Sequence, residues 1–154
     1  MNIPFDVLSI LNGINDIGFG LRLNCGADSE KFRFVYDRIL SETKEAKPDA
    51  LIVLCEPFLV KFLTEGSQDI YHDWAVWYSA LKERGAIVKE LSQKYHTVFV
   101  PLLEAFEAAL KIAPEEHWTC DAIHPSHAGH ELIKREWLKT VLPVMKEKGL
   151  LNKK

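Results

Sequence analysis

Residues 50–55 read A-L-I-V-L-C, an unbroken apolar run that is followed by Glu56-Pro57. A strand that is apolar at every position is buried on both faces, as in a parallel sheet with helices on each side. Two more apolar runs flank it in the sequence. Residues 5–11 (F-D-V-L-S-I-L) end at Asn12-Gly13, and residues 97–100 read T-V-F-V. The sequence therefore predicts three strands of one parallel sheet.

The segments between these runs show helical periodicity or turn composition. Helices are predicted over residues 29–47 with Ser29 as N-cap, over 73–95, over 102–112, and from residue 127 onward. We expect Pro143 to bend or end the last helix. Residues 17–28, rich in Gly, Asn and Asp, predict a loop, as does the polar stretch that reaches Ser126. Strands alternating with helices predict an α/β layer fold, whose working residues follow the carboxyl ends of strands.

Length and charge exclude several classes of protein. The chain has 154 residues, 47% hydrophobic and 27% charged, so we expect one globular domain over residues 1–154. Its formal net charge is −3 and no basic stripe is present, which argues against nucleic acid and anionic membrane as partners. No apolar run reaches the roughly 18 residues of a membrane-spanning helix.

The cysteines and the N-terminus predict a cytoplasmic location. Cys25, Cys55 and Cys120 are widely spaced and odd in number, which favours free thiols in a reducing compartment. Residues 1–6 lack the basic region and cleavage site of a signal peptide, although a removed leader stays compatible with the sequence.

The sharpest chemical signal is the segment Asp121-Ala122-Ile123-His124-Pro125. An Asp three residues before a His on a tight turn can accept the Nδ1 proton of the imidazole and leave Nε2 as a general base. The alternative is a turn with a capping Asp and a bystander His. A second signal is Asn15, between Gly13 and Asp16, whose amide can donate to a developing oxyanion. Its alternative is an Asn-Asp turn selected for loop chemistry.

His124, His127 and His130 recur every third residue and suggest a metal site. On a helix, three residues at that spacing fan around the axis, whereas metal ligands must converge. We therefore predict no metal and no cofactor.

Taken together, the two motifs resemble the SGNH (GDSL) hydrolase superfamily. The resemblance rests on Gly13-Ile14-Asn15-Asp16 after an apolar strand, on Glu56-Pro57-Phe58, and on the tract from Trp118 through Asp121, His124-Pro125-Ser126 and Gly129-His130. It implies a flavodoxin-like, three-layer α/β/α fold, here reduced to about three strands, and ester hydrolysis by a Ser-His-Asp triad. It also implies His124 as general base, Asp121 as its orienting partner, Asn15 as oxyanion donor and Trp118 as a pocket residue.

The chain departs from the family pattern at the nucleophile. The family's serine lies in a Gly-Asp-Ser block on an N-terminal strand, and this sequence contains no such tripeptide. The stretch Gly26-Ala27-Asp28-Ser29 imitates it, but a helix N-cap explains that stretch better. Ser9 lies inside a predicted strand, and Ser126 is too close to His124 along the chain.

We therefore expect an N-terminally truncated family member. Missing strands would expose one edge of the sheet, which favours a homo-oligomer through that edge. The expected function is hydrolysis of small carboxylic esters, such as acetyl groups on carbohydrate, with the serine outside this chain. The alternatives are a catalytically inactive scaffold and an oligomeric binding module.

Overall fold

The computed structural model describes residues 4–23, 28–61 and 74–152, and within them three strands form one parallel sheet. The strands are β1 (Val7–Leu11), β2 (Leu51–Cys55) and β3 (Val98–Val100), in the order β1-β2-β3. In the register of the sheet, Val7 pairs with Leu51 and Val53 pairs with Val98. The apolar run at residues 50–55 thus supplies the central strand, as predicted.

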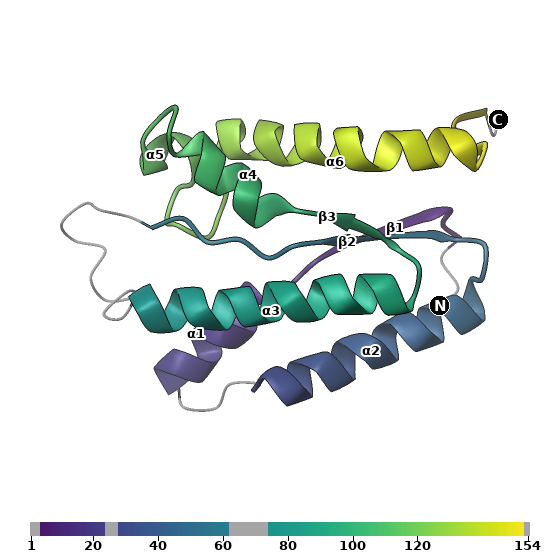
Figure 1. Ribbon diagram of the computed structural model, residues 1–154, viewed down its shortest axis with the longest axis horizontal. Coiled ribbons are helices and arrows are strands. Elements are labelled where there is room, and N and C mark those ends of the chain that lie inside the picture. Colours follow the sequence, from purple (N-terminus) through teal and green to yellow (C-terminus); the bar gives the residue numbers. More distant parts are fainter. Residues whose placement is uncertain (1–3, 24–27, 62–73, 153–154) are drawn as a thin grey trace.

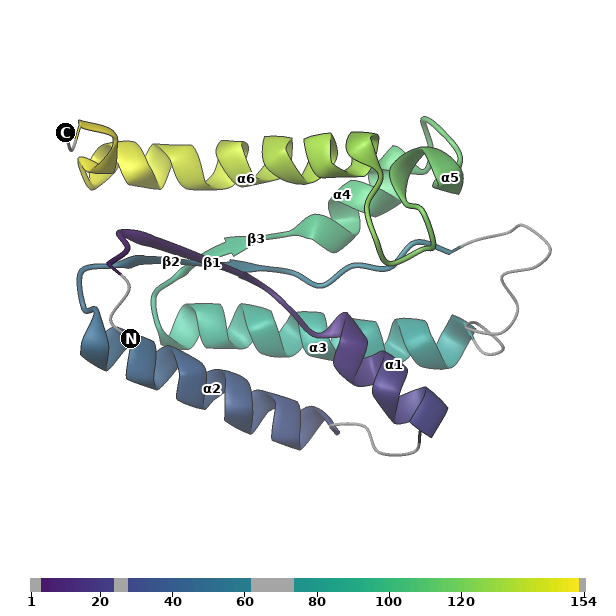
Figure 2. The ribbon, with the colours of Figure 1, turned by 180° about the vertical axis from the view of Figure 1, so that it is seen from behind.

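Helices cover both faces of this sheet. They are α1 (Ile14–Leu23), α2 (Ser29–Ala46), α3 (Trp74–Lys94), α4 (Leu102–Ala109), α5 (Glu115–Trp118) and α6 (His127–Glu147), followed by the 3₁₀ turn η1 (Leu150–Asn152). Figures 1 and 2 show α2 and α3 on one face, with α1 beside them, and α4 and α6 on the other. This arrangement confirms the predicted α/β layer fold. Among the described residues, no helix has the length and apolar composition needed to cross a membrane.

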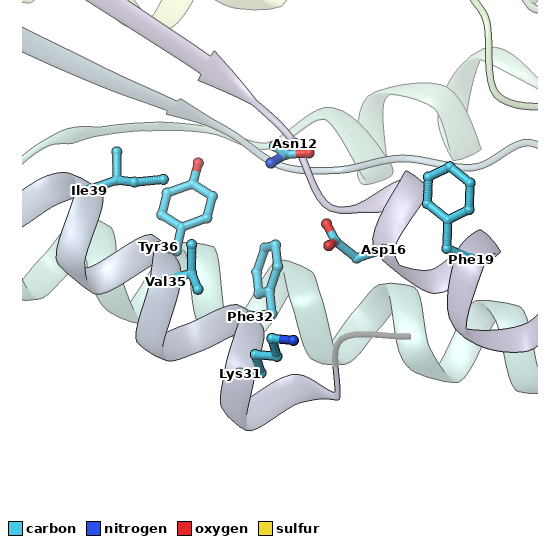
Figure 3. A pocket seen from close by; sticks show the side chains of 8 residues that line it. All are labelled: Asn12, Asp16, Phe19, Lys31, Phe32, Val35, Tyr36 and Ile39. Atoms are coloured by element: carbon cyan, nitrogen blue, oxygen red, sulfur yellow. The ribbon is translucent and has the colours of Figure 1, made fainter. Parts of the chain in front are cut away.

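One side of the sheet ends at β1, which pairs only with β2 among the described residues. A groove of about 400 Å³ lies between this edge, α1 and α2 (Figure 3). Its lining consists mainly of apolar and aromatic side chains with a few polar ones: Asn12, Asp16, Phe19, Lys31, Phe32, Val35, Tyr36 and Ile39. This groove therefore lies directly beside the edge of the sheet.

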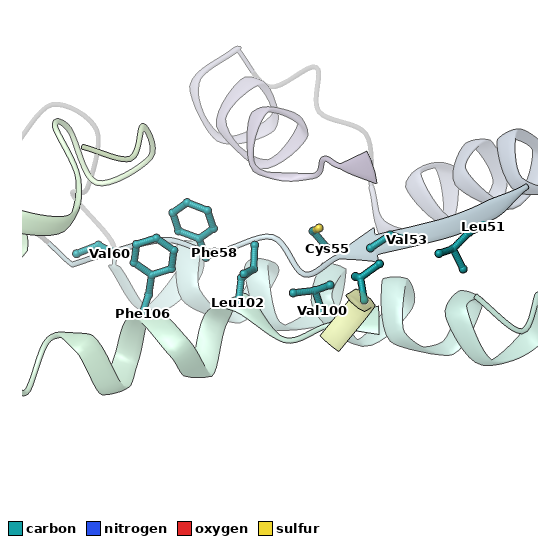
Figure 4. Close-up of a cluster of buried hydrophobic side chains, with 9 residues drawn as sticks. Leu51, Val53, Cys55, Phe58, Val60, Val100, Leu102 and Phe106 are labelled. Carbon is teal, nitrogen blue, oxygen red and sulfur yellow. The ribbon is translucent and has the colours of Figure 1, made fainter. Parts of the chain in front are cut away.

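The central strand explains why the core has two halves. Leu51, Val53 and Cys55 belong to a buried cluster with residues of α4 and α6 (Figure 4). In that cluster Phe58 stacks on Phe106, with ring centroids 4.0 Å apart. Ile52 and Leu54 pack instead against the buried residues of α2 and α3, which are Phe32, Tyr36, Leu40, Ile87, Val88 and Leu91. Alternate side chains of β2 therefore enter opposite layers, and both layers are apolar.

The expected loop over residues 17–28 was wrong, because α1 continues to Leu23. Ile17 is buried in a cluster with Trp77 and Leu81 of α3, so tertiary packing stabilises a helix despite its glycines. Gly18 lies directly against the indole, and a Cβ there would sit 3.2 Å from the Trp77 ring. The glycine that suggested a loop is in fact a close-contact position within a helix. Residues 24–27 of the expected loop, including Cys25, lie outside the described residues.

Three helix boundaries also differ from expectation. The N-cap of α2 is Asp28 and not Ser29, since the Asp28 carboxylate accepts the Lys31 N–H at 2.7 Å. Pro143 lies inside α6, which continues to Glu147 because Val141 and Val144 on either side pack onto the core. The polar stretch before residue 126 contains the short helix α5. These corrections add one short helix and move helix ends, and the predicted order of strands and long helices is unchanged.

Candidate active site

Asp121 and His124 lie in the loop between α5 and α6 and are in direct contact. Asp121 Oδ2 is 2.7 Å from His124 Nδ1. The other carboxylate oxygen accepts the backbone N–H groups of Ile123 at 3.1 Å and His124 at 2.8 Å. One carboxylate therefore shapes the turn and orients the imidazole. A ring held through Nδ1 presents Nε2 as its proton acceptor, and the His124 side chain is 72% exposed.

The loop that carries this pair is fixed at both ends. The Cys120 N–H donates to the His124 carbonyl at 2.8 Å, and the Ser126 N–H donates to the Trp118 carbonyl at 3.0 Å. At its tip Ala122 has a φ of +72° and is fully buried. The Ala122 carbonyl accepts the Val60 N–H at 3.0 Å, which ties the loop to the segment after β2. The position of His124 thus depends on the segment after β2 as well as on its own turn.

Hydrogen bonding controls the charge of Asp121. Partial burial by itself would raise the pKa of this carboxyl group. The N–H of His124, the His124 ring and the N–H of Ile123 outweigh that effect, and the pKa of Asp121 is lowered. The group is therefore ionised at neutral pH, as an orienting partner must be.

Asn15 and His124 line the same pocket, which measures about 190 Å³. Asn15 is the second residue of α1, four positions after the carboxyl end of β1 at Leu11, so it lies in a helix and not in the Asn-Asp turn that was the alternative. Gly13 makes the sharp connection between β1 and α1 with a φ of +131°. The other lining residues come from the end of β1 and the start of α1, from the segment after β2 and from the loop before α6: Leu11, Asn12, Ile14, Pro57, Phe58, Ile123 and Pro125. The structure thus brings together the three residues that the sequence singled out.

The serines considered from the sequence have other roles. Ser126 is the N-cap of α6, where Oγ accepts the Gly129 N–H at 3.2 Å and donates to the His117 carbonyl at 2.5 Å. Ser9 Oγ accepts the indole N–H of Trp137 at 3.0 Å on the α6 side of the sheet. The described residues that line the His124 pocket include no serine, threonine or cysteine.

Other candidate residues lie away from the pocket. Trp118 donates its indole N–H to the Ala113 carbonyl and lines a separate hollow between α4 and α6. Asp16 lines the groove beside β1 and is absent from the lining of the His124 pocket. In the part of the chain that the structure describes, no group of three or more His, Cys, Asp or Glu side chains could hold a metal ion.

Two pocket residues, Phe58 and Ile123, lie within the motifs quoted from the sequence but were not predicted as pocket residues. The segment after β2 and the loop before α6 bring them into the site. Glu56 beside them has a supporting role. Its Oε2 accepts the Leu103 N–H at 3.1 Å, in the first turn of α4, and burial raises the pKa of its carboxyl group. A Cβ on Gly85 would meet Glu56 Oε1 at 3.0 Å, so the glycine in α3 leaves room for this carboxylate.

Asp121→Asn is expected to lower the free energy of unfolding at neutral pH by less than about 1 kcal/mol, because the group is half exposed. The folded-state pKa of Asp121 lies below the ordinary value near 3.9, so its contribution is present above that value and is lost as the pH falls through the folded value. Urea unfolding of both proteins at neutral pH and near pH 2 checks this expectation. A difference in stability that persisted in acid would contradict it.

Comparison with known proteins identifies the family of the chain. Residues 3–132 match the model of the GDSL-like lipase/acylhydrolase family. An acetylxylan esterase of Geobacillus stearothermophilus is 28% identical over 138 residues, which cover 88% of this chain and 59% of that protein.

Solved structures agree with this assignment. A structure described as a GDSL-like lipase from Parabacteroides merdae superposes with a TM-score of 0.78 at 34% identity, covering 87% of this chain and 59% of the other. A variant of an acetyl-xylooligosaccharide esterase from the same Geobacillus species gives a TM-score of 0.71 at 26% identity, covering 88% and 59%. The chain thus spans 59% of the length of these relatives. With the family model matched over most of its length, the chain belongs to the GDSL-like lipase/acylhydrolase family.

Proposed function

We propose that this chain carries the general base of a carboxylic-ester hydrolase that removes small acyl groups, such as acetyl groups on xylooligosaccharides. The observation that supports the proposal is the His124–Asp121 pair, 2.7 Å apart, in one pocket with Asn15. A base, an orienting carboxylate and an amide donor are three of the four groups that acyl transfer needs, and the fourth is the attacking hydroxyl group.

The chemistry assigns a role to each of these residues. Asp121 accepts a hydrogen bond from the His124 Nδ1–H, so Nε2 takes the proton of an attacking hydroxyl group as that oxygen bonds to the ester carbonyl carbon. The carbonyl oxygen becomes an oxyanion, to which the Asn15 amide donates. The protonated His124 then gives its proton to the departing alcohol as the ester C–O bond breaks. A water molecule attacks the acyl group by the same sequence and regenerates the hydroxyl group.

The attacking hydroxyl group is proposed to come from outside this chain. None of the described residues that line the pocket has a hydroxyl or thiol side chain. Among the structures of the Geobacillus esterase, two are called catalytic mutants, and one of these replaces a serine and the other an aspartate with alanine. The lack of a hydroxyl or thiol side chain among the described lining residues also favours a second candidate function, a scaffold that retains the site without turnover.

The size of the pocket supports a small acyl group. At about 190 Å³ it is below the roughly 300–1,000 Å³ of sites for drug-sized ligands. Leu11, Phe58 and Ile123 give it apolar walls, and Phe58 is held in place by stacking on Phe106. An acetyl group fits between these walls.

The proposal is tested with acetylated xylooligosaccharide and with 4-nitrophenyl acetate and octanoate. When the polypeptide that carries the external hydroxyl group is supplied, we expect acetate release and a preference for the acetyl ester over the octanoyl ester by at least about tenfold, the equivalent of 1.4 kcal/mol. Fluorophosphonate labelling with peptide mapping, compared with His124→Ala, locates the nucleophile. A His124-dependent adduct on a serine of this chain would refute an external hydroxyl group. Absence of turnover with that hydroxyl group supplied would favour the inactive scaffold.

A cytoplasmic location is also proposed. Cys55, which is buried, and Cys120, which is exposed, are both free thiols in the structure. An exposed free thiol is typical of proteins in a reducing compartment, and this supports the proposal.

A further inference from the structure

Glu56 directly follows β2, and its carboxylate connects the end of this strand to the first turn of α4. We propose that Glu56 is a positioning residue, which holds the wall of the His124 pocket and the loop of His124 in place through the hydrogen bond that it accepts from the Leu103 N–H. The contacts involved join β2, β3, α3 and α4 to that loop and do not depend on the edge of β1. The consequence for catalysis rests on the proposed ester hydrolysis, whereas the effect on the loop does not.

Glu56 is fixed at its backbone and at its side chain. Its N–H donates to the Val100 carbonyl of β3 at 2.9 Å, and its Oε2 accepts the Leu103 N–H at 3.1 Å. The first N–H groups of a helix have no partner inside the helix, and Pro101, the N-cap of α4, makes no side-chain cap. Glu56 therefore supplies, from 47 positions away, the acceptor that the sequence before α4 does not.

The Leu103 side chain connects this hydrogen bond to the loop of His124. Leu103 is buried in one cluster with Leu59 and Ala122. Ala122 lies two positions before His124, and its carbonyl accepts the Val60 N–H at 3.0 Å. A change at the start of α4 would therefore reach the base through side-chain packing and through a backbone hydrogen bond.

The same helix holds the wall of the pocket. Phe58 lines the pocket and stacks on Phe106 of α4, with an interplanar angle of 11° (Figure 4). Phe106 is fully buried, so the ring of Phe58 rests on a fixed surface. The segment after β2 is thus fastened to α4 twice, at Glu56 and at Phe58.

The fold makes room for the Glu56 carboxylate inside α3. Gly85 is buried in the middle of that helix, where a glycine is less favourable than an alanine. A Cβ at this position would lie 3.0 Å from Glu56 Oε1 and 3.4 Å from its Cγ. The glycine is explained by the side chain that it admits, which supports a specific role for Glu56.

The contacts require Glu56 as an acceptor and not as a charge. Burial raises the pKa of Glu56 and outweighs the Leu103 N–H, which lowers it. Among the described charged groups near it, Glu104 and Glu107 of α4 raise this pKa further, and Lys89 of α3 lowers it. A raised pKa means that a neutral carboxyl group suits this environment better than an ionised one. A neutral side chain of the same shape should therefore fill the role.

Amide hydrogen exchange in the full chain, followed by NMR, tests the proposal with two variants of similar size. Glu56→Met fills the space without an acceptor oxygen, and Glu56→Gln keeps one. We expect Glu56→Met to lower the protection of the Leu103 and Val60 N–H groups by at least about tenfold. The Leu51 N–H, which donates to the Asp6 carbonyl at the other end of β2, should be affected far less. Glu56→Gln should keep all three N–H groups near the wild-type level.

Glu104→Gln is the matched control. Glu104 is exposed in the first turn of α4 and carries the same charge near the same helix end, but the Leu103 N–H donates to Glu56. The control should leave exchange at Leu103 and Val60 unchanged. The proposal would be overturned by unchanged protection in Glu56→Met, by an equal loss at Leu51, or by a Gln variant that does not restore protection. Failure of Glu56→Met to fold would also overturn it, since the role would then be structural in general.

Hydrolysis of 4-nitrophenyl acetate, with the external hydroxyl group supplied, shows what the loop position contributes to the reaction. We expect Glu56→Met to lower kcat by about tenfold with little change in KM, because a displaced base alters the reacting geometry more than it alters binding. Glu56→Gln should retain the wild-type kcat. A Met variant with the wild-type kcat would overturn the positioning role. A wild type without turnover would instead refute the proposed hydrolysis, and the exchange result would still decide whether Glu56 holds the loop.

Discussion

His124→Ala is expected to lower kcat/KM for ester hydrolysis by about 10²–10⁴-fold, the range that general acid–base catalysis supplies. The imidazole is the only titratable side chain among the described residues that line the pocket, and it is held by the Asp121 carboxylate. Without it, no described side chain in the pocket can take the proton of the attacking hydroxyl group. Hydrolysis of 4-nitrophenyl acetate, with the external hydroxyl group supplied, measures the loss.

The control for this variant is His130→Ala. His130 is exposed on the first turn of α6, six residues away, and lines no part of the His124 pocket. We expect it to retain full activity, and we expect both variants to unfold at the wild-type urea concentration because both rings are exposed. Equal rates for wild type and His124→Ala would exclude His124 as the base.

Gly129→Ala is expected to destabilise the protein by about 3 kcal/mol or more, the upper part of the range for overpacking. A Cβ at this position would lie 2.1 Å from the Trp118 carbonyl oxygen and 2.9 Å from Pro125 Cβ. The backbone carbonyl cannot rotate away like a side chain, because it accepts the Ser126 N–H. The methyl group must therefore separate α6 from the loop that holds His124. Urea unfolding measures the change in stability.

Gly149→Ala separates this steric effect from backbone strain. Gly149 has a φ of +67°, and no atom lies within 4 Å of a Cβ built there. Its replacement should cost only the roughly 1–2 kcal/mol of a left-handed residue. If the two variants were equally stable, close packing at Gly129 would not be the cause of its effect.

The sheet could be predicted from the sequence because its signal is local. Each strand is a continuous apolar run, and β2 is apolar at every position because both of its faces are covered. The helix α1 could not be predicted, since its glycines indicate a loop and its stability comes from Ile17 against Trp77, sixty positions away. At the start of α2, Asp28 and Ser29 are both good N-caps, and only the fold decides between them.

In the candidate site, too, some contacts could be predicted from the sequence and others could not. The contact between Asp121 and His124 is local, so three-residue spacing on a turn was sufficient to predict it. That Asn15 shares the pocket follows from the parallel order of the strands, which gathers their carboxyl ends. Phe58 and Ile123 could not be predicted, because their place depends on how the segment after β2 passes the loop, where Val60 and Ala122 are hydrogen-bonded.

The carboxylate of Asp121 holds the loop and the imidazole at once, since one oxygen accepts two backbone N–H groups and the other contacts the His124 ring. In an enzyme that works as proposed, natural selection would act on both uses. A descendant that lost its activity would still be under pressure to keep an acceptor at this position, while its histidine would be free to drift. In a newly sequenced genome, the aspartate of this motif would therefore indicate only that the loop has this shape. The histidine three residues later would be the indication that the chemistry is kept.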